Sequence, residues 1–250
     1  MTDLKGKWAL VTGASRGLGK LAAEVLAEYG CNLILHSRKT EGTKDIAEKL
    51  TEKYSIEVFS VAADLGDEQS VRQMLGLIDE KNIVPDVVLN NAGLQIAYRD
   101  KIYDTPVSDY DISFRVNTIA PMIICYHYIP KMIEKGFGRI VNTTSGINLE
   151  PEQAGYSASK AALDKITADI GKNLEGTDVM INLVDPGWCR TELGGPNAPN
   201  SPESAVPGIV LGAFLDDKKS GRIFRSCDYH GMTLEQAVEL EENKKGSVYN

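Results

Sequence analysis

Residues 8–19 read WALVTGASRGLG, and this stretch decides the fold of the chain. The apolar run Trp8–Val11 has the composition of a buried strand, and the residues after the last glycine show the apolar periodicity of a helix. Between the two, Gly13 permits a tight turn, Gly17 lets the backbone approach a pyrophosphate, and Gly19 lets the helix pack closely on the sheet. The stretch therefore predicts a strand, a phosphate-binding turn and a helix.

The rest of the chain continues this alternation of short apolar runs and amphipathic segments. Strands that are apolar throughout and separated by helices imply a parallel sheet that is covered on both faces. We therefore predict one α/β domain over residues 1–250, a doubly wound, Rossmann-like parallel sheet with helices on both faces. Further strands are predicted at 32–35, 57–62, 86–89, 139–142 and 179–184, and helices at 17–29, 44–53, 68–80, in the region up to 134, and at 156–174.

Two segments near the end of the chain depart from this alternation. Residues 188–207 contain four prolines and follow a strand end, where doubly wound sheets bind their ligands. A long loop at such a place is typical of a functional lid, so we predict a substrate-side lid loop. Residues 233–250 are predicted to be a C-terminal tail that begins as a charged helix.

Composition and charge argue against several classes of partner. The chain has 250 residues, with 27 Lys and Arg against 35 Asp and Glu, and no dense basic run, so nucleic acid is not an expected partner. The most apolar stretch, 119–133, is interrupted by Pro121 and Pro130, and no membrane span is expected there. The N-terminus lacks the pattern of a signal peptide. The four cysteines and three histidines show no ligand spacing, so we expect no metal site and reduced thiols in a cytoplasmic protein.

The end of the second strand indicates which dinucleotide the turn would hold. Sites selective for NAD usually carry Asp or Glu there, to bind the ribose 2′-hydroxyl. Residues 35–39 read LHSRK and contain no acid. Arg16 and Arg38 offer planar guanidinium groups that suit a 2′-phosphate, which favours NADP(H) over NAD(H). The alternative is that both are solvated surface arginines.

Several short motifs follow one another along the chain. In order, they are Thr12-Gly13-x-x-x-Gly17-x-Gly19, Asp64-Leu65, Asn90-Asn91-Ala92-Gly93, Asn117, Ser145, Tyr156-x-x-x-Lys160 and Pro186-Gly187-x-x-x-Thr191. Together they resemble the short-chain dehydrogenase/reductase family in its compact single-domain branch, over about residues 6–224. The segment that follows Pro186 resembles carbonyl reductases within the family.

The resemblance implies a nicotinamide cofactor and a set of residues around it. The implied cofactor contacts are Gly13, Ser15, Arg16, Gly17, Leu18, Gly19, Ser37, Arg38, Asp64, Leu65, Asn91, Ala92, Gly93, Tyr156, Lys160, Pro186, Gly187, Trp188 and Thr191. The implied catalytic residues are Asn117, Ser145, Tyr156 and Lys160, and the expected substrate contacts are Ser145, Ile147, Tyr156 and Trp188.

The chemistry of the catalytic set can be argued beside the resemblance. Tyr156 and Lys160 are four residues apart and share a helix face, so the ammonium is expected to lower the pKa of the phenol and let it act as acid and base. Ser145 offers a hydroxyl that polarises a carbonyl. The resemblance suggests that Asn117 holds a water in a proton relay with Lys160. The alternatives are a turn serine and a satisfied core asparagine.

The sequence therefore predicts an NADP(H)-dependent oxidoreductase that reversibly reduces a ketone or aldehyde to an alcohol. A 3-oxoacyl thioester reductase of the same family and a non-catalytic NADP(H)-binding sensor are the alternatives. Ser145 and Tyr156 are eleven positions apart, a shorter spacing than the family usually shows, so the substrate stays open. The expected partner is a small carbonyl or alcohol substrate, and the resemblance implies a homodimer or homotetramer.

Overall fold

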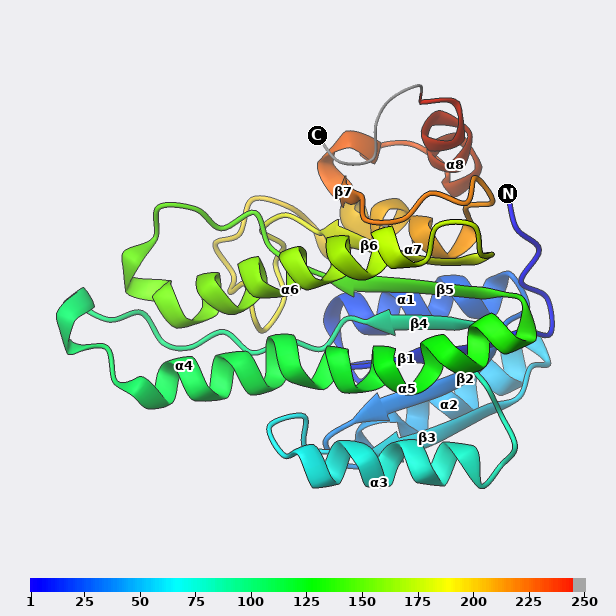
Figure 1. Ribbon diagram of the computed structural model, residues 1–250, viewed down its shortest axis with the longest axis horizontal. Coiled ribbons are helices and arrows are strands. Elements are labelled where there is room, and N and C mark those ends of the chain that lie inside the picture. Colours follow the sequence, from blue (N-terminus) through cyan, green and yellow to red (C-terminus); the bar gives the residue numbers. More distant parts are fainter. Residues whose placement is uncertain (245–250) are drawn as a thin grey trace.

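Seven parallel strands form the centre of the protein in the computed structural model, which describes residues 1–244 (Figure 1). Their order in the sheet is β3-β2-β1-β4-β5-β6-β7. The order reverses between β1 and β4, and this confirms the predicted doubly wound, Rossmann-like sheet. The strands are β1 Trp8–Val11, β2 Asn32–Ser37, β3 Val58–Ala62, β4 Val87–Asn90, β5 Gly138–Thr143, β6 Val179–Asp185 and β7 Ile223–Arg225.

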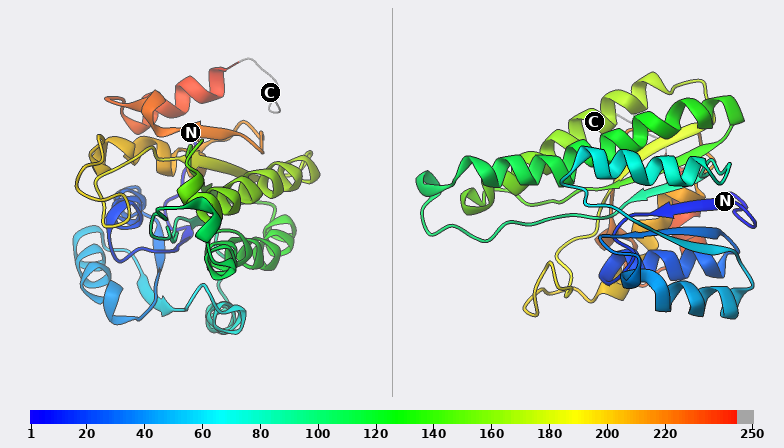
Figure 2. Two further views of the ribbon diagram at one scale, coloured as in Figure 1. Left: turned by 90° about the vertical axis from the view of Figure 1, so that its left-hand side faces the viewer. Right: turned by 90° about the horizontal axis from the view of Figure 1, so that it is seen from below.

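Helices cover both faces of this sheet (Figure 2). One layer contains α1 Gly17–Glu28, α2 Glu41–Tyr54 and α7 Val206–Phe214, with α8 Leu234–Asn243 packed on α7; the other contains α3 Glu68–Asp79, α5 Ala120–Lys135 and α6 Ala154–Asn173. Successive strand residues point to opposite faces, so Val11 and Leu35 join the core under α1 while Leu10 and Ile34 join the core under α5. The strands are apolar throughout because both of their faces are buried.

Two elements were not predicted from the sequence. Helix α7 reads VPGIVLGAF and is apolar on all sides, so it has no amphipathic pattern to reveal it. It is buried from Gly208 to Phe214. Strand β7 is only three residues long and buries Phe224 alone. The irregular part of the predicted lid is shorter than 188–207, because a short helical turn occupies Pro202–Ala205 and α7 follows it.

The C-terminal tail begins as α8, whose capping box joins Thr233 and Gln236. The last part of the predicted tail, 245–250, lies outside the described residues. Among residues 1–244, no helix is both long enough and apolar enough to cross a membrane.

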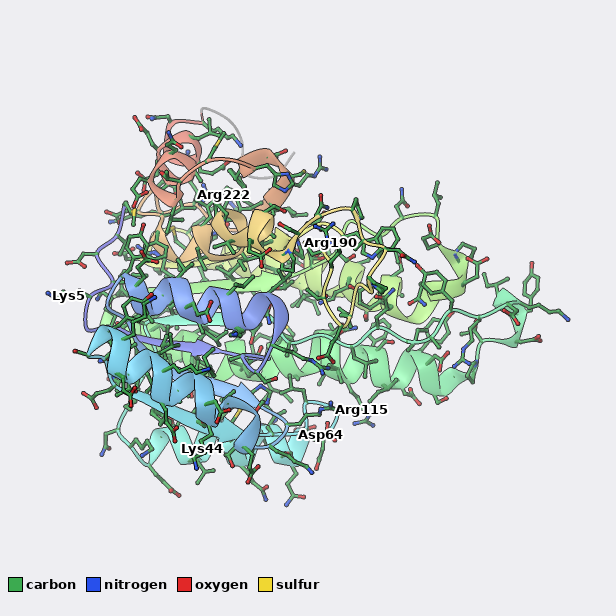
Figure 3. All side chains as sticks on the ribbon, turned by 180° about the vertical axis from the view of Figure 1, so that it is seen from behind. Lys5, Lys44, Asp64, Arg115, Arg190 and Arg222 are labelled. Carbon is green, nitrogen blue, oxygen red and sulfur yellow. The ribbon has the colours of Figure 1, made fainter. Side chains whose placement is uncertain are left out.

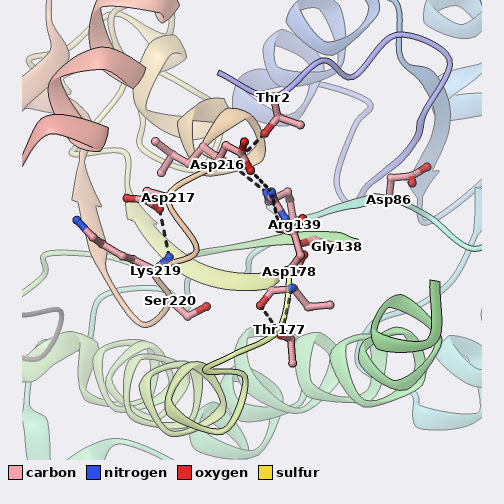
Figure 4. Close-up of polar contacts among 12 residues, drawn as sticks. Thr2, Asp86, Gly138, Arg139, Thr177, Asp178, Asp216, Asp217, Lys219 and Ser220 are labelled. Atoms are coloured by element: carbon pink, nitrogen blue, oxygen red, sulfur yellow. Dashed lines mark hydrogen bonds and ion pairs between the residues drawn. The ribbon is translucent and has the colours of Figure 1, made fainter. Parts of the chain in front are cut away.

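At the edge of the sheet where the strands begin, Arg139 joins three segments (Figure 4). Its side chain is fully buried, and burial lowers its pKa. The guanidinium donates to the carbonyls of Leu215 at 2.9 Å and Asp178 at 2.8 Å, and pairs with the Asp178 carboxylate at 2.9 Å. The start of β5 is therefore tied to the turn before β6 and to the chain that leaves α7.

Candidate active site

The glycine-rich turn lies where β1 ends and α1 begins. Gly13 and Gly17 have φ of 68° and 54°, in the left-handed region that suits glycine. A Cβ at position 19 would lie 2.3 Å from the Gly13 carbonyl oxygen, so only glycine fits there. Helix α1 begins after Arg16 with no side-chain cap and no acid in its first turn. Its first backbone N–H groups therefore suit an anion, and the turn fits the pyrophosphate of a dinucleotide.

A buried histidine that sequence reasoning did not assign to this site holds the turn from β2. His36 Nδ1 accepts the backbone N–H of Gly13 at 3.2 Å, and Nε2 donates to the carbonyl of Ala63 at 3.1 Å. Only a neutral imidazole can do both, and burial lowers the pKa of His36 accordingly. The apolar pattern of the strand indicates only that this part of the chain is buried, and it does not reveal that His36 holds the Gly13 turn.

The residues expected to meet the adenosine end of a dinucleotide lie at the ends of β2 and β3. A Cβ at Gly42 would lie 3.0 Å from Ser37 Oγ and 3.5 Å from Ser15 Cβ, so these two serines flank the start of α2. Asp64, which is labelled in Figure 3, follows β3. Its carboxylate accepts the backbone N–H of Gly66 at 2.8 Å. Leu65, next to it, is buried.

The two arginines expected to bind a 2′-phosphate differ in their surroundings. Arg16 forms an ion pair with Glu192 on the loop after β6. Arg38 is exposed and makes no hydrogen bond or ion pair with any of residues 1–244. The Arg38 guanidinium is therefore free to bind an anion at this edge, whereas the Arg16 guanidinium is already paired with the Glu192 carboxylate.

The segment Asn90–Gly93 ties β4 to its neighbours in the sheet. Asn91 Nδ2 donates to the Thr12 carbonyl at 3.1 Å, and the N–H of Ala92 donates to Thr12 Oγ1 at 3.0 Å. On the other side, Asn90 Nδ2 donates to Asn142 Oδ1 at 2.8 Å. These bonds fix the carboxyl ends of β1, β4 and β5 relative to one another.

The loop after β6 is held together by its own hydrogen bonds and touches the glycine turn. Trp188 is exposed, and its Nε1 donates to the Gly194 carbonyl at 2.7 Å. A Cβ at Gly17 would lie 3.4 Å from Thr191 Cγ2, so the turn and the loop are in contact. This loop carries Pro186, Gly187 and Arg190 beside the same sheet edge (Figure 3).

Tyr156 and Ser145 meet at the centre of this edge. Tyr156 is buried, and burial raises its pKa. The nearby hydroxyl of Ser145 lowers that pKa, while the charge of Asp185 and the nearby Tyr98 raise it. Ser145 Oγ also accepts the N–H of Ile147 at 3.2 Å. A phenol in these surroundings stays protonated at neutral pH.

Lys160 lies one helical turn beyond Tyr156 and is buried. Its Nζ donates to the Thr143 carbonyl at 2.6 Å, and burial lowers its pKa to about 8. We expected Lys160 to lower the pKa of Tyr156, and the structure does not show this. Burial of the phenol has a larger effect on the Tyr156 pKa than any neighbouring group, and the neighbour that lowers this pKa is Ser145.

Asn117 is fully buried in a π-helical turn between α4 Val107–Phe114 and α5. Its amide pairs with Leu94 through two bonds of 2.8 Å and donates to Ser159 Oγ at 3.0 Å. Pro121 has no N–H, so the Asn117 carbonyl cannot receive the ordinary α-helical bond from four residues ahead. The hydrogen-bonding groups of the Asn117 side chain thus have partners within the protein, which agrees with the alternative of a satisfied core asparagine.

A small space nevertheless separates Asn117 from Lys160. A Cβ placed on Gly93 would lie 3.6 Å from Asn117 Oδ1 and 3.7 Å from Lys160 Nζ. A polar molecule the size of water has partners on both sides there. The described part of the chain contains no group of His, Cys, Asp and Glu placed to hold a metal ion.

Comparison with known proteins identifies the family of this chain. The sequence profile of the family described as short chain dehydrogenase matches residues 7–201. The chain belongs to the short-chain dehydrogenase/reductase family. It is therefore an NAD(P)-dependent oxidoreductase that acts on CH–OH or C=O groups. A 3-oxoacyl-[acyl-carrier-protein] reductase of Aquifex aeolicus is 32% identical over 216 residues, which cover 84% of this chain and 85% of that protein.

Solved structures of similar fold include short-chain dehydrogenases/reductases with a bound cofactor. L-sorbose reductase from Gluconobacter frateurii, complexed with NADPH and L-sorbose, matches with a TM-score of 0.78 at 22% identity, over 94% of this chain and 99% of that chain. A 3-oxoacyl (acyl-carrier-protein) reductase from Agrobacterium tumefaciens C58 with NADP bound matches with a TM-score of 0.77 at 24% identity, over 89% and 93%. These relatives bind NADP(H) on the fold described above.

Proposed function

We propose that this short-chain dehydrogenase/reductase is an NADP(H)-dependent carbonyl reductase that reversibly converts a ketone or aldehyde into an alcohol. The observation that carries the proposal is the placement of the Ser145 hydroxyl near enough to Tyr156 to lower its pKa, with Lys160 one turn away on the same helix. The nicotinamide, when bound, supplies the hydride that joins the carbonyl carbon.

Each residue of the catalytic set has a separate task. Ser145 donates a hydrogen bond to the carbonyl oxygen and stabilises the charge that develops on it. The O–H bond of Tyr156 breaks and its proton passes to that oxygen, which completes the alcohol. Lys160 then returns a proton to Tyr156, and the space between Lys160 and Asn117 suits a water that carries protons from solvent. In the reverse direction Tyr156 accepts the proton.

The cofactor preference rests on the edge of the site near α2. Strand β2 ends at Ser37 and is followed by Arg38 and Lys39, without the acid that a 2′-hydroxyl would need. The exposed and unpaired Arg38 supports NADPH over NADH. Arg16 would contribute only after it leaves Glu192. The irregular part of residues 188–207, which ends before the helical turn at Pro202–Ala205, serves as the substrate-side lid, since Thr191 on it touches the glycine turn and Trp188 is held to Gly194 within it.

A 3-oxoacyl thioester reductase is the second candidate, favoured by the similarity to the Aquifex aeolicus protein. The loop between β5 and α6 helps to distinguish the thioester from a small carbonyl substrate. Its two charged side chains are Glu150 and Glu152. Both are acidic, and like charge opposes a substrate carried on a phosphate-bearing arm. A small neutral carbonyl compound meets no such repulsion.

The test is NADPH consumption with a panel of ketones, aldehydes, quinones and 3-oxoacyl thioesters, repeated with NADH. We expect turnover of a small ketone or aldehyde and its loss by about 10²-fold or more in Tyr156→Phe, which lacks the acid. The matched control is Tyr103→Phe, at an exposed position in the segment before α4. A non-catalytic sensor would bind NADPH and turn over no carbonyl compound. Equal turnover in Tyr156→Phe and Tyr103→Phe would remove Tyr156 from the mechanism.

We further propose a homodimer or homotetramer, as the family resemblance implies, in a reducing cytoplasmic environment. Helix α5 exposes Tyr126 and Ile133, and the adjoining Ile119 is also exposed, so its outer face offers apolar area to a second copy. Light scattering measures the mass in solution. A monomer at micromolar concentration would contradict the assembly and leave the chemistry unaffected.

A further inference from the structure

A carboxylate that the mechanism does not use lies beside the catalytic serine. Asp185 is the last residue of β6, and its Oδ1 accepts the N–H of Gly187 at 2.9 Å. A Cβ on Gly146 would lie 2.5 Å from Oδ2 of Asp185. The carboxylate therefore rests against the backbone of the residue that follows Ser145, in space that any larger side chain at position 146 would fill.

The charge of Asp185 is directed into the active site. It raises the pKa of Tyr156, and also that of Asp164 one turn beyond Lys160. Strands β5 and β6 are hydrogen-bonded neighbours and pair Thr143 with Val184, so the ends of both strands face the same space. Asp185 is thus placed to contact whatever lies between Ser145 and Tyr156.

One oxygen of this carboxylate, Oδ2, has no partner among the residues that the structure describes. Among residues 1–244, no side chain or backbone N–H donates to Oδ2, and no Lys, Arg or His forms an ion pair with Asp185. A half-buried carboxylate is stabilised by a hydrogen-bond donor and disfavours a second negative charge nearby. A substrate can supply that donor.

We infer that Asp185 selects the substrate, accepting through Oδ2 a hydrogen bond from a hydroxyl or ammonium on the carbon next to the reacting carbonyl. This inference rests on the proposed carbonyl reduction. It assigns the substrate class as hydroxyketones or aminoketones, and it excludes ketoacids whose carboxylate would face Asp185. Gly146 is needed because its missing side chain leaves room for the carboxylate.

The experiment compares kcat/KM for four matched ketones: acetone, hydroxyacetone, aminoacetone and pyruvate. A hydrogen bond to a charged acceptor favours the donor-bearing ketone by about 10- to 100-fold in the parent enzyme. Hydroxyacetone and aminoacetone distinguish the hydroxyl from the ammonium as the donor. Pyruvate should be the poorest substrate.

Three variants test whether Asp185 causes this preference. Asp185→Leu should bring the hydroxyacetone-to-acetone ratio of kcat/KM close to one, and Asp185→Asn should improve pyruvate relative to acetone. Gly146→Ala keeps the carboxylate but displaces it, so it should reduce the same ratio. Glu239→Gln, which removes an exposed acid from α8, is the control and should leave the ratio unchanged.

The outcomes separate this inference from the function on which it rests. A parent ratio near one, or a high ratio that survives Asp185→Leu, would overturn the role of Asp185 while carbonyl reduction stands. If the enzyme binds NADPH and reduces no ketone or aldehyde at all, the proposed function fails, and the role of Asp185 fails with it. Ratios are compared within each variant, so a change in the amount of folded enzyme does not alter them.

Discussion

Replacing His36 with leucine should loosen the glycine-rich turn and weaken NADPH binding. His36 is 2% exposed and is the only described partner of the Gly13 N–H and of the Ala63 carbonyl. Leucine fills a similar volume but can neither accept nor donate a hydrogen bond. Two backbone groups, the half-buried N–H of Gly13 in the cofactor turn and the buried carbonyl of Ala63 at the end of β3, would lose their partners.

The size of the effect follows from those two groups. An unsatisfied, fully buried backbone group costs about 1–3 kcal/mol. The Ala63 carbonyl belongs to a buried residue, but Gly13 is only half-buried and its N–H costs less, so the free energy of unfolding should fall by about 2–4 kcal/mol in all. In a domain of this size, that corresponds to a fall in Tm of roughly 6–12 °C. NADPH binding would then have to restore the native conformation of the turn. If this restoration costs about 1.4 kcal/mol of the binding free energy, the Kd for NADPH rises about tenfold.

The same contact predicts a dependence on pH. Burial lowers the pKa of His36 below its usual 6.5, so the folded protein holds a neutral ring while the unfolded chain takes up a proton near pH 6.5. The unfolded state then binds more protons, and stability should fall as the pH drops below about 6.5. This part of the acid sensitivity should be absent from the leucine variant.

Thermal unfolding followed by circular dichroism, with NADPH titrations, measures both effects at neutral pH and in steps below it. His230→Leu is the matched control, because His230 is exposed and its side chain makes no hydrogen bond among the described residues. The reasoning is refuted if His36→Leu keeps the parent Tm and Kd at neutral pH. It also fails if the parent and the variant lose stability equally on acidification.

Raising the pH above about 8 should slow carbonyl reduction, because Lys160 then loses the proton that it returns to Tyr156; a kcat-pH profile that stays flat there would contradict this. Arg38→Glu should lower kcat/KM for NADPH relative to NADH by about tenfold or more, and an unchanged ratio would show that Arg38 does not meet the 2′-phosphate. Arg139→Met should remove about 3 kcal/mol from the free energy of unfolding in urea titrations, because buried carbonyls lose their donor; a change below about 1 kcal/mol would contradict this.

The sheet could be predicted from the sequence because each central strand is a continuous apolar run that can be recognised from its own residues. Leu10 and Val11 face opposite cores, so the apolar run of β1 is continuous, and a continuous run between helices means a parallel sheet. Helix α7 could not be predicted in the same way. It lies between other elements and is apolar on every side, so no periodicity distinguishes it from a loop or a strand.

Spacing along the chain placed Tyr156 and Lys160 on one helix face, but it could not say which atoms they would meet. Lys160 reaches the Thr143 carbonyl of another element, and the pKa of Tyr156 follows burial and Ser145 instead. The same limit hid His36 and Asp185, since each acts on a segment distant in the chain, the Gly13 turn and the Gly146 backbone. A motif reports the residues that the reaction uses. The groups that support or border those residues come from other strands, as His36 does from β2 and Asp185 from β6, so only the folded chain brings them together.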